Sequence, residues 1–504
     1  MYSPVWMRSL CQHLGHSLAR KRFVSGLASD EELRRNATVC PPEPKSRKKK
    51  SRNVSALEGE NSSWEERLSH AVTPLWTVGY EDQLKVKFDG QKKILQTLVS
   101  RLKEVSGEHI TSPSTREDSC CPLQPVVPSP VLYGYRNKST FSVNRGPDGD
   151  PKTVGYYLRD RSNNIICVRG DHLENIPEKH KQVSQLYEEY IKLSPLDACL
   201  LFHQGGHWRE ITVRTNRTGD TMAIVTFHPQ DLSQEELCLQ KESLKEFFTR
   251  GPGAVCNLTS LYFQESTMTR CTHEQSPYQL LHGEPHIFEE LLGLKIRISP
   301  DAFFQVNTAG AEVLYKTIAE LSHVSRNTVF LDVCCGTGTI GLSMANQVSE
   351  VLGIELIENA VEDAKWNASF NGISNCKFHS GKAEVVLPEL LLTLQGNHPF
   401  TAVVNPSRAG LHYRVTRAIR NCRRIRTLVY VSCKPQGEAM RNLLEKYGIV
   451  NRRLKRRAGT PQEADWRARI ARTLLEAVQR TRNAGTLLEA GRRTRNTGTQ
   501  LEAG

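Results

Sequence analysis

The fold of this chain is decided by the stretch Leu331-Asp-Val-Cys-Cys-Gly-Thr-Gly-Thr-Ile-Gly341. Its first residues are mostly apolar, which predicts a buried strand, and its glycines at 336, 338 and 341 follow the pattern G-x-G-x-x-G. Glycines in such a turn between a strand and a helix let the backbone approach a nucleotide closely. The stretch therefore predicts a strand-turn-helix unit of a nucleotide-binding α/β domain.

Residues 296–450 have the same character, because predicted strands and helices alternate along them. Such alternation predicts a doubly wound parallel sheet, in which ligands bind at the carboxyl ends of the strands. We therefore expect an α/β, Rossmann-like domain here. The strand candidates are Thr328–Cys334, Glu350–Leu356, Lys377–Ser380, Ala402–Asn405 and Thr427–Cys433.

The residues around the glycines bear on which cofactor this turn would bind. The pattern of Gly336 and Gly338 alone fits a dinucleotide dehydrogenase as well as a methyltransferase. Asp332 lies near the end of the strand, just before the glycines. Its carboxylate would repel the pyrophosphate of a dinucleotide, whereas it would attract the positively charged S-adenosylmethionine. Glu355, which ends the next strand, is positioned to accept hydrogen bonds from ribose hydroxyls. We favour a class I methyltransferase domain that binds S-adenosylmethionine, with NAD binding and a purely structural turn as alternatives.

The chain before residue 296 has a different pattern. Residues 63–125 form a predicted helical lead-in, since apolar residues recur at helical intervals between Gln83 and Val105. Residues 126–295 consist of short alternating runs separated by turn residues, which predicts an antiparallel α+β domain. The runs are Ser139–Asn144, Thr153–Leu158, Ile165–Arg169, Arg209–Arg214 and Ala223–His228.

The two ends of the chain supply its net charge of +13. Residues 1–52 hold 12 Lys/Arg against 4 Asp/Glu, and residues 451–504 hold 13 against 5. Residues 1–29 are basic and lack acidic residues, which is typical of a mitochondrial presequence and predicts a location in the matrix, with a disordered N-terminus as the alternative. Residues 30–62 are interpreted as a basic linker, and the tail contains a 13-residue low-complexity repeat, so we expect disordered ends. RNA affinity of the centre must then come from local basic patches.

Cys433 is the cysteine to which we assign a chemical role. The fourteen cysteines contain no C-x-x-C pair, so we predict no metal site, and no apolar run is long enough to span a membrane. Cys433 follows an apolar run at the predicted mouth of the cofactor cleft, where a thiolate could act as a nucleophile. Nearby positive charge from Arg408 or Lys434 could raise the thiolate fraction. A lone cysteine after an apolar strand is more often a core residue, so both interpretations stay open at this point.

Three separated motifs lie between about Trp64 and Pro435: Tyr135-Arg-Asn-Lys138, Ser299-Pro-Asp-Ala-Phe-Phe-Gln-Val-Asn307 and Asn405-Pro-Ser-Arg-Ala-Gly410. Together they resemble motifs of the RNA uracil-C5 methyltransferase family, in particular its vertebrate mitochondrial members. The resemblance implies methylation of carbon 5 of a uridine in tRNA or rRNA. It further implies that Gln305 contacts the cofactor, that Glu355 binds its ribose and that Cys433 adds to carbon 6 of the uridine. In the third motif Asn405 replaces the family's Asp, which keeps an acceptor oxygen but weakens the contact with cofactor or base.

The resemblance also assigns RNA contacts and reveals a missing residue. Arg136, Asn137 and Lys138 fall on the family's RNA-facing sheet domain, where they would contact a structured RNA. The family's general base, a Glu in a histidine-containing segment after the nucleophile, has no counterpart that we can identify in residues 451–504. Loss of a general base costs about 10²- to 10⁴-fold in rate. We therefore expect impaired turnover, and a catalytically inactive RNA-binding or RNA-folding protein is the alternative.

Overall fold

The computed structural model describes residues 62–106, 123–160, 162–199, 205–267, 276–394, 396–436 and 441–442. The expectations for the presequence, for all but the last residue of the basic linker and for the repeat tail lie outside these ranges. Within them, no helix is both long and apolar enough to cross a membrane, and no group of three or more His, Cys, Asp or Glu side chains is arranged to hold a metal ion.

Two helices precede the first sheet and correspond to the predicted lead-in. Helix α2 spans Trp64–Val72 and begins with a capping box, in which Ser63 and Glu66 each accept a hydrogen bond from the other's backbone N–H. Helix α3 spans Tyr80–Ser106 and contains the whole of the predicted helix Gln83–Val105. The apolar spacing therefore predicts this helix correctly, although the structure begins it slightly earlier.

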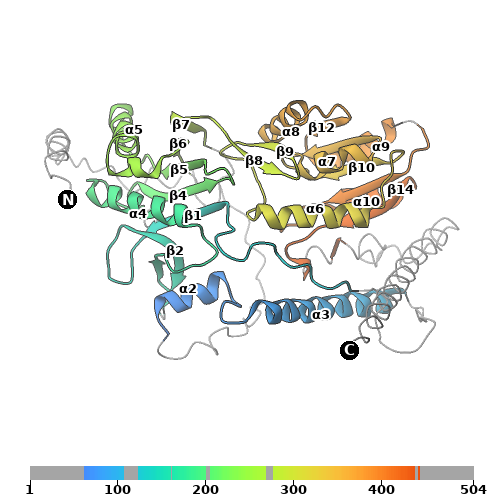
Figure 1. Ribbon diagram of the computed structural model, residues 1–504, viewed down its shortest axis with the longest axis horizontal. Coiled ribbons are helices and arrows are strands. Elements are labelled where there is room, and N and C mark those ends of the chain that lie inside the picture. Colours follow the sequence, from blue (N-terminus) through green and yellow to red (C-terminus); the bar gives the residue numbers. More distant parts are fainter. Residues whose placement is uncertain are drawn as a thin grey trace, which may run out of the picture. The chain divides into compact units, whose positions relative to one another are not determined.

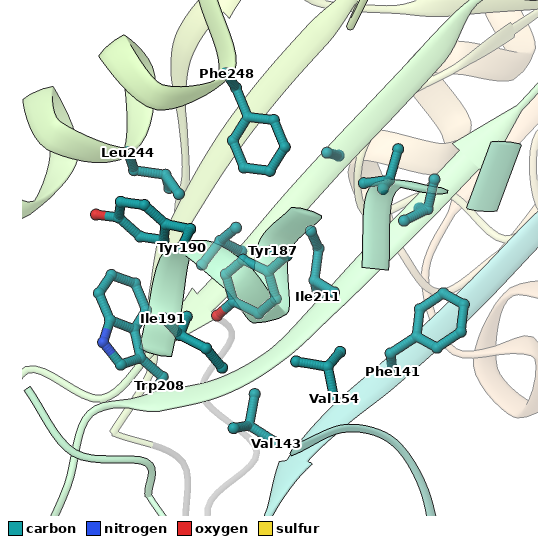
Figure 2. Close-up of a cluster of buried hydrophobic side chains, with 14 of the residues drawn as sticks. Phe141, Val143, Val154, Tyr187, Tyr190, Ile191, Trp208, Ile211, Leu244 and Phe248 are labelled. Carbon is teal, nitrogen blue, oxygen red and sulfur yellow. The ribbon is translucent and has the colours of Figure 1, made fainter. Parts of the chain in front are cut away.

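A seven-stranded sheet follows, with the strand order β3-β2-β1-β4-β5-β6-β7. One face of this sheet is apolar and packs against helices α4 and α5 in a single core. Figure 2 shows the centre of this core, where Trp208 lies edge-on against Tyr190 and both rings are buried. The elements are β1 (Lys138–Asn144), β2 (Thr153–Arg159), β3 (Ile165–Val168), α4 (Glu178–Leu193), β4 (Trp208–Thr215), β5 (Thr221–Phe227), α5 (Gln234–Thr249), the short 3-10 helix η3 (Pro252–Cys256), β6 (Ser260–Glu265) and β7 (Tyr278–Gly283).

This sheet corrects one expectation. Strands β5 and β6 run parallel, so the sheet is mixed rather than wholly antiparallel. Helix α5 lies between these strands in the chain, and a parallel pair needs such a crossover. Strands β6 and β7 were not among the predicted runs. Four consecutive residues of β6 are buried, so this strand lacks the alternation that identifies a half-buried strand.

A two-stranded hairpin leads into the C-terminal domain. It consists of β8 (Ile287–Leu291) and β9 (Leu294–Ile298). The predicted boundary between residues 295 and 296 falls inside β9. The apolar side chains of the hairpin pack in a buried cluster that contains residues of the second large sheet together with Met222, Ile224 and Tyr262 of the first, so the hairpin packs with both sheets.

The second large sheet has five parallel strands in the order β12-β11-β10-β13-β14. This is the doubly wound order, which reverses direction between β10 and β13. Helices α6, α7 and α8 pack on one face and α9 and α10 on the other, each face with its own buried apolar cluster. Figure 1 labels these helices around the strands of the sheet. The expected Rossmann-like fold is confirmed. The elements are α6 (Thr308–Ser322), β10 (Val329–Val333), α7 (Thr339–Met344), η4 (Ala345–Gln347), β11 (Glu350–Glu355), α8 (Glu358–Phe370), β12 (Cys376–Ser380), α9 (Ala383–Thr393), β13 (Phe400–Val404), α10 (Tyr413–Asn421) and β14 (Ile425–Tyr430).

Candidate active site

The turn between β10 and α7 depends on its glycines. Gly336 has a φ of +54° and Gly338 a φ of +79°, a backbone region that favours glycine. A Cβ atom at Gly338 would lie 2.9 Å from the ring of Phe378, whereas one at Gly336 would meet nothing within 4 Å. The turn is therefore packed tightly against the protein at Gly338 and is open at Gly336, where a ligand could lie against the backbone.

The carboxylate of Glu355 lies beside the open part of this turn. Glu355 is the last residue of β11, and its Oε2 accepts a hydrogen bond from the N–H of Gly336 at 3.0 Å. Its Oε1 accepts from the N–H groups of Leu356 and Ile357 at 2.8 and 3.1 Å. Three backbone donors thus fix the predicted ribose-binding acid at the carboxyl edge of the sheet.

Asp332 is buried beneath the same turn. Its side chain is inaccessible to solvent, and its Oδ2 accepts a hydrogen bond from the N–H of Gly341 at 2.8 Å. Its Oδ1 has no hydrogen-bond partner among the described residues. Burial raises the pKa of Asp332 to about 7, even though the hydrogen bond from Gly341 acts to lower it. Asp332 therefore holds the start of α7 and keeps one oxygen for a further partner.

Asn405 lies on the other side of the point where the strand order reverses. It directly follows β13, and its N–H donates to the carbonyl of Val333 at the end of β10 at 3.2 Å. Its side chain is half-buried, and Arg408 in the same loop is exposed. Because the carboxyl ends of parallel strands meet at one edge, Asn405 shares that edge with the glycine turn and Glu355.

Cys433 follows β14 at this edge. The strand ends at Tyr430, earlier than predicted, but the N–H of Val431 still donates to the carbonyl of Val404 at 2.9 Å. The segment leading to Cys433 therefore stays aligned with β13. Cys433 is exposed and has a free thiol, and its neighbour Lys434 is exposed too. The alternative interpretation of Cys433 as a core residue is thereby excluded.

Gln305 lies in the segment 299–307, which Asn137 fixes from the side of the first sheet. The Asn137 side-chain amide donates to the Gln305 carbonyl at 2.8 Å and to the Thr308 hydroxyl at 2.9 Å. The backbone N–H of Asn137 donates to the carbonyl of Val306 at 2.9 Å. Both hydrogens of the amide that we predicted to contact RNA are thus engaged within the chain, and Asn137 is a positioning residue for Gln305.

Further residues that the sequence does not single out fix the same segment. Arg214 is buried on β4 and donates a hydrogen bond to the carbonyl of Ala302. Burial lowers the pKa of Arg214 to about 10. On α8, the Asp363 carboxylate accepts from the Ser299 hydroxyl at 2.9 Å. Between these anchors the ring of Phe303 is left 65% exposed.

The two basic residues predicted to contact RNA lie at the start of β1. Arg136 is half-buried, and its Nε donates to the carbonyl of Lys138 at 3.3 Å. Lys138 pairs with Arg214 in the register of β1 and β4. Burial, and secondarily the charge of Arg214, lowers the pKa of Lys138 to about 8. Lys138 therefore keeps most of its charge at pH 7 but loses it under mildly alkaline conditions.

Comparisons with known proteins place this chain beside methyltransferases. A model of a methyltransferase domain matches residues 324–401. The chain is 62% identical to human tRNA (uracil-5-)-methyltransferase homolog B over 84% of each chain, and 42% identical to human homolog A over 79% of this chain and 64% of that protein. It is 64% identical to mouse homolog B over 76% of this chain and 78% of that protein. The crystal structure of Pyrococcus abyssi tRNA (uracil-54, C5)-methyltransferase in complex with S-adenosyl-L-homocysteine resembles it with a TM-score of 0.52 and 21% identity, over 74% of this chain and 78% of that one. This last similarity concerns the fold alone.

Proposed function

Because the chain belongs to the tRNA (uracil-5-)-methyltransferase family, we propose that it methylates carbon 5 of a uridine in a structured RNA, tRNA or rRNA, with S-adenosylmethionine as the methyl donor. The observation that carries the proposal is the position of Cys433. Its exposed thiol follows β14 at the edge of the sheet that also holds the glycine turn and Glu355. A nucleophile and a nucleoside-binding turn on one edge suit a reaction that joins a base to a cofactor.

The residues at this edge fit S-adenosylmethionine. The open backbone at Gly336 would lie against the nucleoside, and Glu355 would accept hydrogen bonds from its ribose. The Oδ1 atom of buried Asp332, which has no partner among the described residues, offers a hydrogen-bonding group beneath the turn. Asn405 and Gln305 are the further polar candidates. The cofactor, when bound, supplies an activated methyl group.

Cys433 performs the covalent step in this proposal. Carbon 5 of uracil is a poor nucleophile until a thiolate has added at carbon 6. The electron pair of the Cys433 thiolate forms the S–C6 bond, and the C5–C6 π pair moves onto carbon 5. Carbon 5 would then form a bond to the methyl group, whose bond to the sulfonium sulfur of the donor breaks and leaves S-adenosylhomocysteine. A base then removes the carbon-5 proton, the C5–C6 double bond forms again, and the S–C6 bond breaks to release the thiolate.

RNA that contains 5-fluorouridine tests this step. Fluorine at carbon 5 cannot leave as a proton, so the adduct accumulates. The full chain with S-adenosylmethionine and 5-fluorouridine tRNA should form a species that survives denaturing electrophoresis, and Cys433→Ala should lose it. Cys238→Ala is the matched control, because Cys238 is an exposed cysteine on α5. RNA binding by the wild-type chain without an adduct would contradict the proposal and favour the catalytically inactive RNA-binding protein.

Release of the product forms a separate part of the proposal. Residues 451–504 contain no segment that resembles the family's general-base segment, which supports slow turnover. The fluorouridine trap needs no proton removal, whereas 5-methyluridine formed in ordinary tRNA, measured by mass spectrometry, needs it. We expect the adduct to form while less than one 5-methyluridine per enzyme accumulates. Many turnovers per enzyme would show that a base is present after all.

We propose further that the protein works in the mitochondrial matrix. The basic, acid-free composition of residues 1–29 supports this location. A reporter fused to residues 1–60 should enter isolated, energised mitochondria, and a reporter that remains outside them would contradict this.

A further inference from the structure

The chain between the candidate active-site residues Asn405 and Cys433 has an unusual charge pattern. From Glu389 to Glu438 there is no intervening Asp or Glu, and residues 408–426 alone contain seven arginines. The excess positive charge of the whole chain resides at its two ends, so this run is a local concentration within the central part. RNA binding by the central part requires a local basic patch of this kind.

Helix α10 has a buried side and an exposed side. Val415 and Ile419 are buried in the core formed with β13 and β14, whereas Arg414 and Arg417, three positions apart, are exposed. Two more exposed arginines follow, Arg423 between the helix and β14 and Arg426 near the start of β14. None of the four forms an ion pair with a carboxylate in the described part of the chain. We call them the arginine stripe: Arg414, Arg417, Arg423 and Arg426.

Other arginines of the same run have structural contacts. Arg424 donates to the carbonyl of Leu394 at 2.9 Å, and its guanidinium lies 4.0 Å from the centre of the Phe400 ring. Arg420 donates weakly to the side chain of Asn421 at 3.5 Å. Packing therefore accounts for these residues, whereas it does not account for the four arginines of the stripe.

The stripe begins at the edge of the sheet that carries Cys433. Helix α10 starts soon after Asn405, with His412 as its N-cap, and its nine residues rise about 13 Å toward the opposite edge. Tyr413 at this start is 53% exposed, and its ring lies 4.6 Å from that of His412. A row of cations thus leads away from the proposed reaction site and has an exposed aromatic ring at its beginning.

We propose that the arginine stripe binds successive phosphates of the RNA strand that flanks the target uridine, while Tyr413 stacks on an adjacent base. Guanidinium groups bind phosphate bidentately, and aromatic rings stack on bases irrespective of sequence. A row of four cations that have no carboxylate partner in the described part of the chain fits a polyanion better than a single small anion. The inference rests on the proposed function, since it concerns the RNA of the same site.

Binding of an unmodified tRNA transcript to the full chain tests the stripe. Fluorescence anisotropy between 50 and 200 mM KCl gives both the affinity and its dependence on salt. Arg414→Ala/Arg417→Ala should weaken binding roughly tenfold or more at 100 mM salt and reduce the magnitude of the slope of log K against log [salt] by about 1.4 to 1.8, the value for two lost phosphate contacts. Lys316→Ala/Arg326→Ala removes two exposed charges elsewhere in the domain and should leave the slope unchanged.

Three readouts separate the possible results. Unchanged affinity and slope in Arg414→Ala/Arg417→Ala would overturn the stripe, and the fluorouridine adduct of the wild-type chain would still report on the proposed function independently. A second outcome would also overturn the inference. If the wild-type chain binds vesicles that contain anionic lipid, and the variant loses this binding but still binds tRNA, the stripe binds a membrane surface. S-adenosylhomocysteine binding by calorimetry checks that the variant is folded, and loss of that binding would require the same test with Arg423→Ala/Arg426→Ala.

Discussion

The backbone N–H of Gly336 donates a 3.0 Å hydrogen bond to the carboxylate of Glu355. This contact joins the turn after β10 to the end of β11. The residue that would bind the ribose therefore also holds the loop against which the nucleoside would lie. A change at Glu355 should consequently affect cofactor binding in two ways, through the lost charge and through the released turn.

Replacement of this carboxylate should weaken cofactor binding. Hydrogen bonds to charged groups contribute about 1.5 to 3 kcal/mol, so Glu355→Gln should raise the Kd for S-adenosylhomocysteine by roughly 10- to 100-fold. Isothermal titration calorimetry measures this directly. Glu358→Gln is the control, because Glu358 is exposed in the first turn of α8 and makes no comparable contact with the glycine turn. Equal affinities of the two variants would remove Glu355 from the cofactor site.

Local patterns explain why this edge of the sheet could be predicted from the sequence. Asp332, Gly336 and Glu355 lie in two neighbouring strand-and-turn units, and the apolar runs before them indicate where each strand ends. In a doubly wound sheet the carboxyl ends of the strands share one edge, so correct strand assignments bring the residues together without any knowledge of contacts. The same rule predicts that Cys433 lies at this edge, even though the strand before it ends earlier than expected.

Contacts between distant residues could not be predicted in this way. Asn137 and Gln305 are 168 residues apart, and Arg214 and Ala302 are 88 apart. No periodicity or spacing relates such pairs, because the contacts arise only when the two sheets have formed. For this reason the sequence assigns Asn137 to RNA contact, whereas in the structure its amide donates to the carbonyl of Gln305 and to the hydroxyl of Thr308.

The raised pKa of Asp332 predicts a specific pH dependence of stability. The folded-state pKa is about 7, whereas the ordinary pKa of an Asp carboxyl is 3.8, so between these values the folded chain holds a proton that the unfolded chain has lost. Stability from this group is therefore fully present below about pH 4 and falls as the pH rises toward 7, by roughly 4 kcal/mol. The amide in Asp332→Asn stays neutral and can still accept the hydrogen bond from Gly341.

The Tm of Asp332→Asn, relative to that of the wild-type chain, should therefore rise between pH 5 and pH 7. Differential scanning fluorimetry at a series of pH values measures this difference, in which the other titrating groups cancel. Asp171→Asn removes an exposed carboxylate and controls for the change in net charge. A difference between Asp332→Asn and wild type that stays constant over this range would mean that Asp332 is ionised in the folded chain throughout.

The amide of Asn137 allows a positioning role to be separated from RNA contact. Asn137→Ala removes two partly buried hydrogen bonds, to Gln305 and Thr308, and should lower the free energy of unfolding by about 2 kcal/mol. Chemical denaturation should show this loss, and it should show little change for Asn359→Ala, which removes an exposed hydrogen bond to Asp301.

The salt dependence of tRNA binding completes this test. Asn137 carries no charge and its amide hydrogens are engaged within the chain, so the slope of log K against log [salt] should be the same in Asn137→Ala as in the wild-type chain. S-adenosylhomocysteine should bind more weakly, because the segment that carries Gln305 loses an anchor. Wild-type stability and cofactor affinity combined with a loss of tRNA affinity would instead identify Asn137 as a direct RNA contact.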